Sequence, residues 1–189
     1  MAYRSPGSDT VAIVDPLGRW SKPTIVGRLV TLRPISSGDT DALWEAVQDP
    51  ESLDLTATTA SFTYEQIAEW CATRAAAPNR IDLAIVEQAT GLWAGEVVLN
   101  EFEPSANSAN FRIALRGPAW FGRGLGGEAT QLIVQHGLQH VGLHRITLEV
   151  LARNARAIRT YERAGFVATE TYLDANEQWI GMEIIASPT

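Results

Sequence analysis

The chain has 189 residues, of which 46% are hydrophobic and 20% charged, and this suits one globular domain with a substantial core. Its formal net charge of −7 argues against a protein that binds the nucleic-acid backbone and mildly favours a cationic substrate. The single cysteine, Cys71, excludes an internal disulfide and a cysteine-rich zinc site.

The N-terminal segment predicts neither export nor a membrane anchor. Its sequence MAYRSPGSDT lacks the apolar core of a secretory signal, and no later run approaches the roughly 18 uninterrupted apolar residues of a membrane span. We therefore expect a cytoplasmic protein with no membrane partner. Residues 1–24 mix Ser, Pro, Gly and Asp without a period, which predicts a tail followed by one domain over residues 25–187.

The first part of the domain predicts one strand and two helices. Alternation over Gly27–Pro34 indicates a strand, and Ser36–Asp49 carries cap residues ahead of a helix that the following Asp-Pro pair is expected to end. Thr63 and Gln66 form a T-x-x-Q capping box before a second helix, which runs to about residue 77.

The middle of the chain predicts three strands in succession. Arg80–Glu87 and Leu92–Asn100 are apolar runs joined by QATG, which indicates a hairpin with Gly91 at its turn. Asn110–Leu115 continues this meander as a third strand.

The last third predicts two helices and three strands. In chain order these are a helix from about Gly126 to Val141, a strand at His144–Leu151, a short helix at Asn154–Ala164, and a hairpin of Phe166–Leu173 with Gln178–Ile185. The whole order is β-α-α-β-β-β-α-β-α-β-β. It predicts a single α/β (α+β) domain with a mixed, largely antiparallel sheet flanked by helices.

A glycine-rich segment, WFGRGLGGEAT, lies just before one of these helices. Gly122, Gly124 and Gly127 spell G-x-G-x-x-G, the fingerprint of a dinucleotide-binding loop. Five glycines fall between Gly117 and Gly127, which is more than a plain turn needs. An anion-binding loop at a helix N-terminus is therefore the better interpretation.

Three features oppose a dinucleotide-binding domain. The segment RGPAWF separates the preceding strand from the glycines, whereas the fingerprint follows its strand by a tight turn. Glu149, near the expected place of a ribose-binding acid, lies among the alternating residues of its strand and not at the carboxyl end. Only 38 residues remain after Leu151, and a second βαβ unit will not fit in them. The strands before the loop also form hairpins, which pair antiparallel.

Two segments taken together resemble the GNAT superfamily of acyl-CoA-dependent N-acyltransferases: PAWFGRGLGGEA around the glycines and RNARAIRTYERAGF at Arg153–Phe166. Together with LRP at Leu32–Pro34, these segments match, in the same order along the chain, the branch that resembles ribosomal-protein-alanine N-acetyltransferases. The family pattern (Q/R)-x-x-G-x-(G/A) falls on Phe121–Gly126. Phe121 departs from the Gln or Arg of the broad pattern but suits this branch, and the resemblance runs from about Gly27 to Ile185.

The resemblance implies a site for acetyl-CoA as co-substrate. In the family the loop holds the coenzyme A pyrophosphate on backbone N–H groups, the strand before it pairs with the pantetheine arm, and an Asn contacts the coenzyme. The residues so implied are Ile113, Ala114, Leu115, Phe121, Gly122, Arg123, Gly124, Leu125, Gly126, Gly127 and Asn154. Arg123 would add charge at a phosphate, and Asn154 also stands at the N-cap of its helix.

The resemblance also implies catalytic residues. Tyr161 matches the family's frequent general acid, which protonates the departing thiolate; the alternative is a packed core tyrosine. Asn110 stands where some members have the general base, a Glu. Glu96 and Glu101 remain as candidates, and we choose Glu101, although a solvated carboxylate is the commoner role for either.

The sequence thus predicts an N-acyltransferase that moves an acetyl or other short acyl group from acyl-CoA to a primary amine by direct attack in a ternary complex, without a metal. The alternatives are an NAD(P)-dependent oxidoreductase and a non-catalytic module that binds coenzyme A. The acceptor is a small-molecule or peptide amine, and we expect Trp44 or the segment Leu53–Phe62 to line its pocket. The identity of this amine and the oligomeric state, including a homodimer, stay open.

Overall fold

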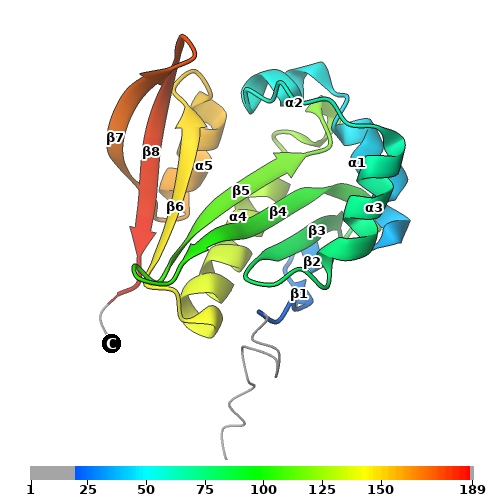
Figure 1. Cartoon of the computed structure of the whole chain (residues 1–189), viewed down its shortest axis with the longest axis horizontal. Coiled ribbons are helices and arrows are strands. Elements are labelled where there is room, and N and C mark those ends of the chain that lie inside the picture. Colours follow the sequence, from blue (N-terminus) through cyan, green and yellow to red (C-terminus); the bar gives the residue numbers. More distant parts are fainter. Residues whose placement is uncertain (1–19, 188–189) are drawn as a thin grey trace, which may run out of the picture.

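The computed structural model describes residues 20–187 (Figure 1). In chain order its elements are β1 (Ile25–Val26), β2 (Val30–Pro34), the 3-10 turn η1 (Ser37–Asp39), α1 (Thr40–Ala46), α2 (Pro50–Leu55), α3 (Tyr64–Arg74), β3 (Ile81–Glu87), β4 (Trp93–Glu103), β5 (Ser108–Leu115), the 3-10 turn η2 (Pro118–Trp120), α4 (Leu125–His136), the π-helical turn η3 (Gly137–Val141), β6 (Arg145–Leu151), α5 (Ala155–Arg163), β7 (Val167–Asp174) and β8 (Glu177–Ile185).

One sheet of eight strands organises the fold, in the order β1-β2-β3-β4-β5-β6-β8-β7. Every neighbouring pair is antiparallel except β5 and β6, which confirms the predicted mixed and largely antiparallel sheet. The parallel pairing covers only Ser108–Asn110 of β5 and Arg145–Thr147 of β6. Beyond it the two strands spread apart into a V, which Figure 1 shows at the centre of the sheet.

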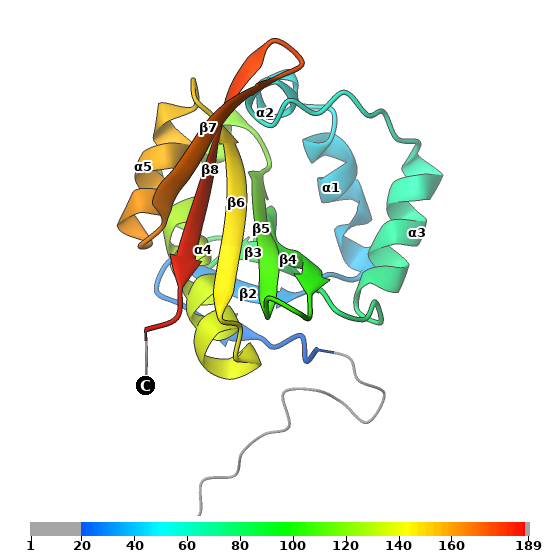
Figure 2. The ribbon, with the colours of Figure 1, turned by 60° about the vertical axis from the view of Figure 1, so that its left-hand side comes forward.

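Helices cover both faces of the sheet. Figure 2 shows α1 and α3 on one side and α4 and α5 on the other. On the α4 side a large core gathers fully buried residues such as Val97, Leu99 and Ile133, and on the α1–α3 side a smaller core includes Leu43 and Cys71. Strands β3 and β4 are therefore buried on both faces, and Cys71 is a buried free thiol in the smaller core.

The capping box predicted for the second helix is confirmed. The Thr63 hydroxyl accepts a hydrogen bond from the Gln66 amide (3.2 Å), and the Gln66 side chain accepts one from the Thr63 amide (2.8 Å). Because two otherwise unpaired amides are satisfied in this way, α3 begins at Tyr64.

The interpretation of Asp49-Pro50 as a simple helix stop is wrong. Helix α1 ends at Ala46, and the same dipeptide starts helix α2, which the sequence analysis does not predict. The Asp49 carboxylate accepts a hydrogen bond from the Ser52 amide (2.8 Å), and Pro50 takes the first helical position, where its missing N–H costs nothing.

Part of the predicted tail has a fixed place on the domain. Trp20 is buried, and its ring lies 4.9 Å from that of Phe102. The Lys22 ammonium donates a hydrogen bond to the Ala77 carbonyl (3.0 Å) and lies 3.9 Å from the Asp82 carboxylate. Residues 1–19, the rest of the predicted tail, lie outside the described residues.

Candidate active site

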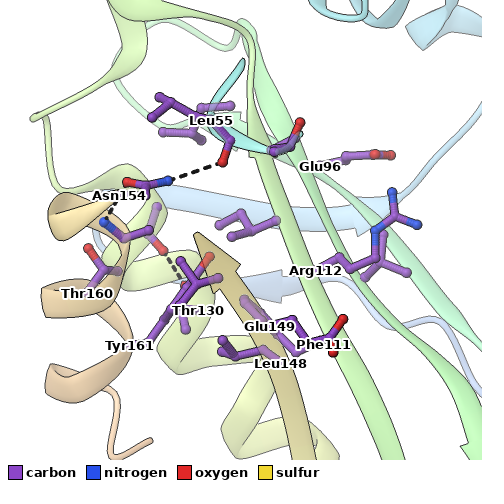
Figure 3. Close-up of a pocket in the computed structure, with 18 of the residues that line it drawn as sticks. Leu55, Glu96, Phe111, Arg112, Thr130, Leu148, Glu149, Asn154, Thr160 and Tyr161 are labelled. Atoms are coloured by element: carbon purple, nitrogen blue, oxygen red, sulfur yellow. Dashed lines mark hydrogen bonds between the residues drawn. The ribbon is translucent and has the colours of Figure 1, made fainter. Parts of the chain in front are cut away.

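A cleft with a volume of about 1830 Å³ runs through the V between β5 and β6 (Figure 3). It brings together every residue proposed for the site from sequence except Arg123. These residues are Glu101, Ile113, Ala114, Leu115, Phe121, Gly122, Gly124, Leu125, Gly126, Gly127, Asn154 and Tyr161. Leu53 and Phe62, the two ends of the segment expected to line the acceptor pocket, also line the cleft.

The glycine loop forms a turn that ends in the first residues of α4. Gly122 and Gly124 adopt positive φ angles of 71° and 81°, a backbone conformation that L side chains rarely adopt. Helix α4 begins at Leu125, and its first intrahelical bond runs from the Glu128 amide to the Gly124 carbonyl. The amides of residues 125–127 therefore have no intrahelical acceptor, and such a helix N-terminus attracts an anion.

Gly126 keeps the helix start accessible from the cleft. A Cβ at this position would lie 3.5 Å from Leu115 Cδ1 and 3.8 Å from Ile113 Cδ1, so it would fill the space between α4 and β5. The Thr130 hydroxyl donates a hydrogen bond to the Gly126 carbonyl (2.7 Å) from one turn farther on (Figure 3). The loop thus combines an open backbone with a fixed helix end, and this fits a pyrophosphate.

Strand β5 offers a free backbone edge to the cleft. It pairs with β4 as far as Leu115 but with β6 only as far as Asn110. The edge of residues 111–115 that faces β6 is therefore available for a ligand with amide groups, which would add to the sheet as a further strand does. The Arg116 amide donates to the Ala94 carbonyl of β4, and backbone groups of successive residues turn to opposite edges, so of the predicted residues Ile113 and Leu115 turn to this free edge and Ala114 turns to β4.

Arg123 does not line the cleft. Its guanidinium forms an ion pair with the buried Glu87 carboxylate and stacks over the Trp120 ring, 5.0 Å from the centroid. The ion pair holds the glycine loop against the end of β3, and the ring contact joins the loop to the 3-10 turn η2 just before it. Arg123 thus positions the loop, and its charge is already balanced by Glu87.

Asn154 caps α5 as its sequence position predicts. Its side-chain oxygen accepts a hydrogen bond from the Ala157 amide (3.1 Å), and its amide nitrogen donates to the Leu55 carbonyl of α2 (3.5 Å) (Figure 3). Next to it, the Arg153 guanidinium binds the Asp54 carboxylate (2.6 Å). The start of α5 is therefore tied to α2 across the mouth of the cleft.

Tyr161 lies in the cleft as a largely buried side chain on α5. Its ring packs edge-on against that of Phe111, with 5.7 Å between centroids, and is also in contact with Phe166. Burial raises the pKa of the Tyr161 hydroxyl to about 12, so the group stays protonated at neutral pH. The position suits both a packed aromatic residue and a proton donor.

The two candidate carboxylates on β4 have different surroundings. Glu101 is exposed, has a positive φ of 53°, and accepts a hydrogen bond from the Asn100 side chain (3.3 Å). Glu96 Oε2 is buried and has no hydrogen-bond partner within residues 20–187. Burial is the largest cause that raises the pKa of Glu96, and nearby Asp82 adds to it; the positive charges of Arg112 and Arg80 lower the pKa, and the net value is about 7.

The wall formed by β6, β7 and β8 carries further carboxylates. In register, Glu149 of β6 and Glu170 of β7 stand on either side of Gly181 of β8, and all three line the cleft. Tyr172 donates a hydrogen bond to Glu149. Among the described residues no Lys or Arg forms an ion pair with either glutamate, so this wall is negatively charged.

Several contacts that shape the site have no clear signal in the sequence. Glu128, in the first turn of α4, accepts hydrogen bonds from the amides of Arg28 (3.0 Å), Leu29 (2.6 Å) and Val30 (2.8 Å), which fixes the glycine loop to β2. An acid at a helix start indicates only a favourable dipole contact. The sequence does not indicate the Glu87–Arg123 ion pair either, because it joins residues 36 positions apart.

Within residues 20–187, no helix is long and apolar enough to cross a membrane, and no three or more His, Cys, Asp or Glu side chains gather into a possible metal site. His136 and His140 instead stack on one another, with 5.2 Å between their rings. Burial lowers the pKa of His136 to about 4.

Comparison with solved structures gives the same fold in several acetyltransferases. The chain superposes on a GNAT-family acetyltransferase of Bacillus anthracis with a TM-score of 0.75 at 17% identity, covering 86% of this chain and 98% of the other. For the spermidine N-acetyltransferase of Vibrio cholerae in complex with CoA and spermine, the TM-score is 0.73 at 19% identity, with coverage of 83% and 95%.

A third similar structure is a Vibrio cholerae protein provisionally assigned as a ribosomal-protein-serine acetyltransferase. Its TM-score is 0.70 at 21% identity, and the match covers 87% of this chain and 98% of that one. A comparison with curated protein sequences gave no match. The sequence profile described as the acetyltransferase (GNAT) domain matches residues 29–167, from β2 to the start of β7. The chain therefore belongs to the GNAT family, as an acyl-CoA-dependent N-acetyltransferase.

Proposed function

We propose that the chain transfers an acetyl group from acetyl-CoA to a cationic primary amine, with Glu96 as general base and Tyr161 as the hydrogen-bond donor to the leaving sulfur. The observation that carries this assignment is the buried Glu96 Oε2, which has no partner and belongs to a carboxyl group whose pKa lies near 7. A base is most effective when its pKa is close to the working pH. This proposal replaces our choice of Glu101, whose carboxylate is exposed and already accepts a hydrogen bond.

The donor would lie between the two arms of the V. The amides at the start of α4, from Leu125 to Gly127, would hold the pyrophosphate, and the free edge of β5 would pair with the amides of the pantetheine arm. An N–H of the same edge, within Ile113–Leu115, would donate to the thioester oxygen, where negative charge develops during the attack. Asn154 would meet the coenzyme at the mouth of the cleft.

In the reaction the amine nitrogen attacks the thioester carbonyl carbon. The C–N bond forms, the C–S bond breaks, and no covalent enzyme intermediate is required. The ammonium acceptor first loses one proton to the Glu96 carboxylate, directly or through one water, to give the free amine that attacks. After the attack the nitrogen still carries one proton more than the amide product, and this proton passes to the departing sulfur as the C–S bond breaks, which gives the free thiol. Because a thiol's ordinary pKa of about 8.5 lies below that of Tyr161, the Tyr161 hydroxyl keeps its own proton in the net reaction and stabilises the sulfur as a hydrogen-bond donor.

A cationic acceptor is supported by carboxylates on two sides of the cleft that form no ion pair with a Lys or Arg of residues 20–187. Glu96 lies on β4, and Glu149 and Glu170 lie on the wall formed by β6, β7 and β8. The spermidine N-acetyltransferase named above was solved with spermine, an amine of this class. We therefore propose a polyamine or another amine with a second positive charge in preference to a neutral amine.

The test of Glu96 is the pH dependence of kcat/KM. The base works only when deprotonated, so kcat/KM should rise with pH through an apparent pKa near 7 in the wild-type protein. Glu96→Gln should lose this rising limb of the pH profile and lower kcat by roughly 100-fold, the usual contribution of a general base to the rate. Glu101→Gln is the matched control and should keep both the limb and most of the activity.

If Glu101→Gln removes the limb and Glu96→Gln keeps it, the roles of the two carboxylates are reversed. A limb that persists in both single variants assigns the titration to the amine itself.

A further inference from the structure

We infer that Asp82 of β3 is a positioning residue for Glu96, and that Lys22 and Arg80 hold its negative charge beside the base. Through Lys22, the segment just ahead of β1 takes part in the active site. The inference rests on the proposed function, because it takes Glu96 as the base. We call Lys22, Arg80 and Asp82 the Asp82 network.

Asp82 and Glu96 lie on the same face of the sheet. In the antiparallel pairing of β3 with β4, Asp82 lies opposite Val98, and Ala84 lies opposite Glu96. Residues opposite one another share a face, and so do residues two apart along a strand, which makes Asp82 and Glu96 diagonal neighbours within roughly 8 Å. Ala84 belongs to the smaller core, so this is the face that α1 and α3 cover. The two carboxyl groups are therefore close enough for one charge to act on the other.

Two cations hold the buried Asp82 carboxylate. Arg80 binds both of its oxygens, with Nε 2.8 Å from Oδ2 and Nη2 2.6 Å from Oδ1. Lys22 Nζ lies 3.9 Å from Oδ2, and the exposed fractions of the Lys22 and Asp82 side chains are only 5% and 0%. Burying a carboxylate without such partners is costly, so the two cations keep Asp82 charged in this one place.

Lys22 is itself fixed at the end of α3. Its ammonium donates hydrogen bonds to the carbonyls of Arg74, the last residue of α3, and of Ala77 just beyond it (3.0 Å for Ala77). A cation at this end of a helix also interacts favourably with the helix dipole. Two residues earlier, Trp20 is buried with its ring against that of Phe102. The chain at residues 20–22 is thus anchored on the domain, which gives the Lys22 charge a defined position.

The charges around Glu96 come from several elements. Burial is the largest cause that raises the Glu96 pKa; among the charges, Arg112 of β5 lowers it, Asp82 raises it, and Arg80 lowers it by less than Asp82 raises it. Figure 3 shows Arg112 on the same side of the V as Glu96. On α3 the Cys71 thiol is neutral at physiological pH, because burial raises its pKa. Asp82 thus opposes the loss of the Glu96 proton, and Arg80, which also lines the cleft, limits this effect.

The experiment follows the rising limb of kcat/KM with pH in variants of the Asp82 network. Asp82→Asn removes a negative charge and should move the limb to lower pH by roughly one unit. Arg80→Gln removes a positive charge and should move the limb to higher pH, and Lys22→Gln should move it in the same direction. The double variant Arg80→Gln/Asp82→Asn removes both charges, so its limb should lie close to that of the wild type.

The matched control is Arg33→Gln/Asp39→Asn. It removes a second bidentate ion pair, with distances of 2.8 Å and 2.6 Å, whose two residues do not line the cleft. The control should leave the limb in place, and circular dichroism checks that each variant is folded. A merely structural role of Asp82 would lower kcat and leave the limb where it is. Single variants of Asp82 and Arg80 that move the limb in the same direction, or not at all, would overturn the inference, and so would a control that moves it as far.

A different result would contradict the proposed function instead, namely a rising limb that persists in Glu96→Gln. The Asp82 network is then tested on the Glu96 proton itself, without turnover. The carboxyl carbon of Glu96 is followed by NMR as a function of pH, and its signal is assigned by its loss in Glu96→Gln. Its midpoint should move to lower pH in Asp82→Asn and to higher pH in Arg80→Gln, and a midpoint that moves in neither variant would overturn the inference.

Discussion

At the scale of single residues, the surroundings of each side chain in the fold separate two candidate bases that the sequence does not separate. Glu96 and Glu101 are both acids of the same strand, and no spacing rule separates them. Glu96 lies on the inner part of β4, where its Oε2 is buried, whereas Glu101 follows with a positive φ at an irregular pairing of β4 with β5. Glu96 pairs with Ala84 of β3 and Ala114 of β5, and its pKa depends on its burial there and on Asp82, Arg80 and Arg112, so the raised pKa is a property of the assembled fold.

The buried acid should also affect stability. The folded protein holds the Glu96 proton up to a pKa of about 7, while the unfolded chain releases it near the ordinary value of 4.5. The free energy of unfolding should therefore fall as the pH rises from about 4.5 to about 7, and stay low above it. Glu96→Gln should stabilise the protein at pH 8 by up to about 3 kcal/mol and change little at pH 4.5.

Urea unfolding of the wild type and the Glu96→Gln variant at both pH values measures this difference, with Glu101→Gln as the exposed control. A stabilisation of the same size at pH 4.5 and pH 8 would mean that the substitution acts through packing and not through charge.

At the scale of elements, motifs with local causes were predicted well and elements with non-local causes were not. The capping box at Thr63 and the glycine loop before α4 depend on residues a few positions apart, and both are seen in the structure. Helix α2 was missed because Asp49 and Pro50 signal both a stop and a start. The free edge of β5 arises because β6 leaves it after Asn110, and that divergence is a property of the sheet as a whole.

The start of α4 offers a direct test of the donor site. Gly126 has no positive φ, and a Cβ there makes only ordinary contacts with Leu115 and Ile113, so Gly126→Asp should fold. Its carboxylate would face the phosphates and should weaken CoA binding at least 100-fold. This factor corresponds to about 3 kcal/mol, which comes from lost charge-assisted hydrogen bonds and from the added repulsion between negative charges. Gly124→Asp is a poorer probe, since the φ of 81° strains any other residue.

Calorimetric titration with CoA measures the effect of Gly126→Asp. Gly38→Asp is the matched control, because Gly38 also lacks a positive φ and its nearest neighbour would be 3.6 Å from a Cβ. Equal affinities for the Gly126 variant and the wild type would remove the loop from the donor site.

At the scale of the whole molecule, the V between β5 and β6 determines the chemistry. A dinucleotide-binding domain needs parallel strands side by side, and here the single parallel pair joins only three residues on each strand. Figure 3 shows Asn154 and Tyr161 on one side of the V and Glu96 and Arg112 on the other. In the proposed function the donor would enter from the α4–α5 side and the amine from the α1–α3 side. Arg153 links the two arms through Asp54 of α2 and Glu177 of β8.

The most direct test of this account is thiol release from acetyl-CoA over a panel of amines, each measured with the wild type and with Glu96→Gln. The panel contains spermidine, a diamine, a neutral-chain monoamine and a peptide with a free N-terminus. We expect the wild type to release thiol fastest with the amines that carry a second positive charge, and Glu96→Gln to slow that release roughly 100-fold. Thiol release that is no faster with any amine than without one, or that is the same in both proteins, would contradict the account.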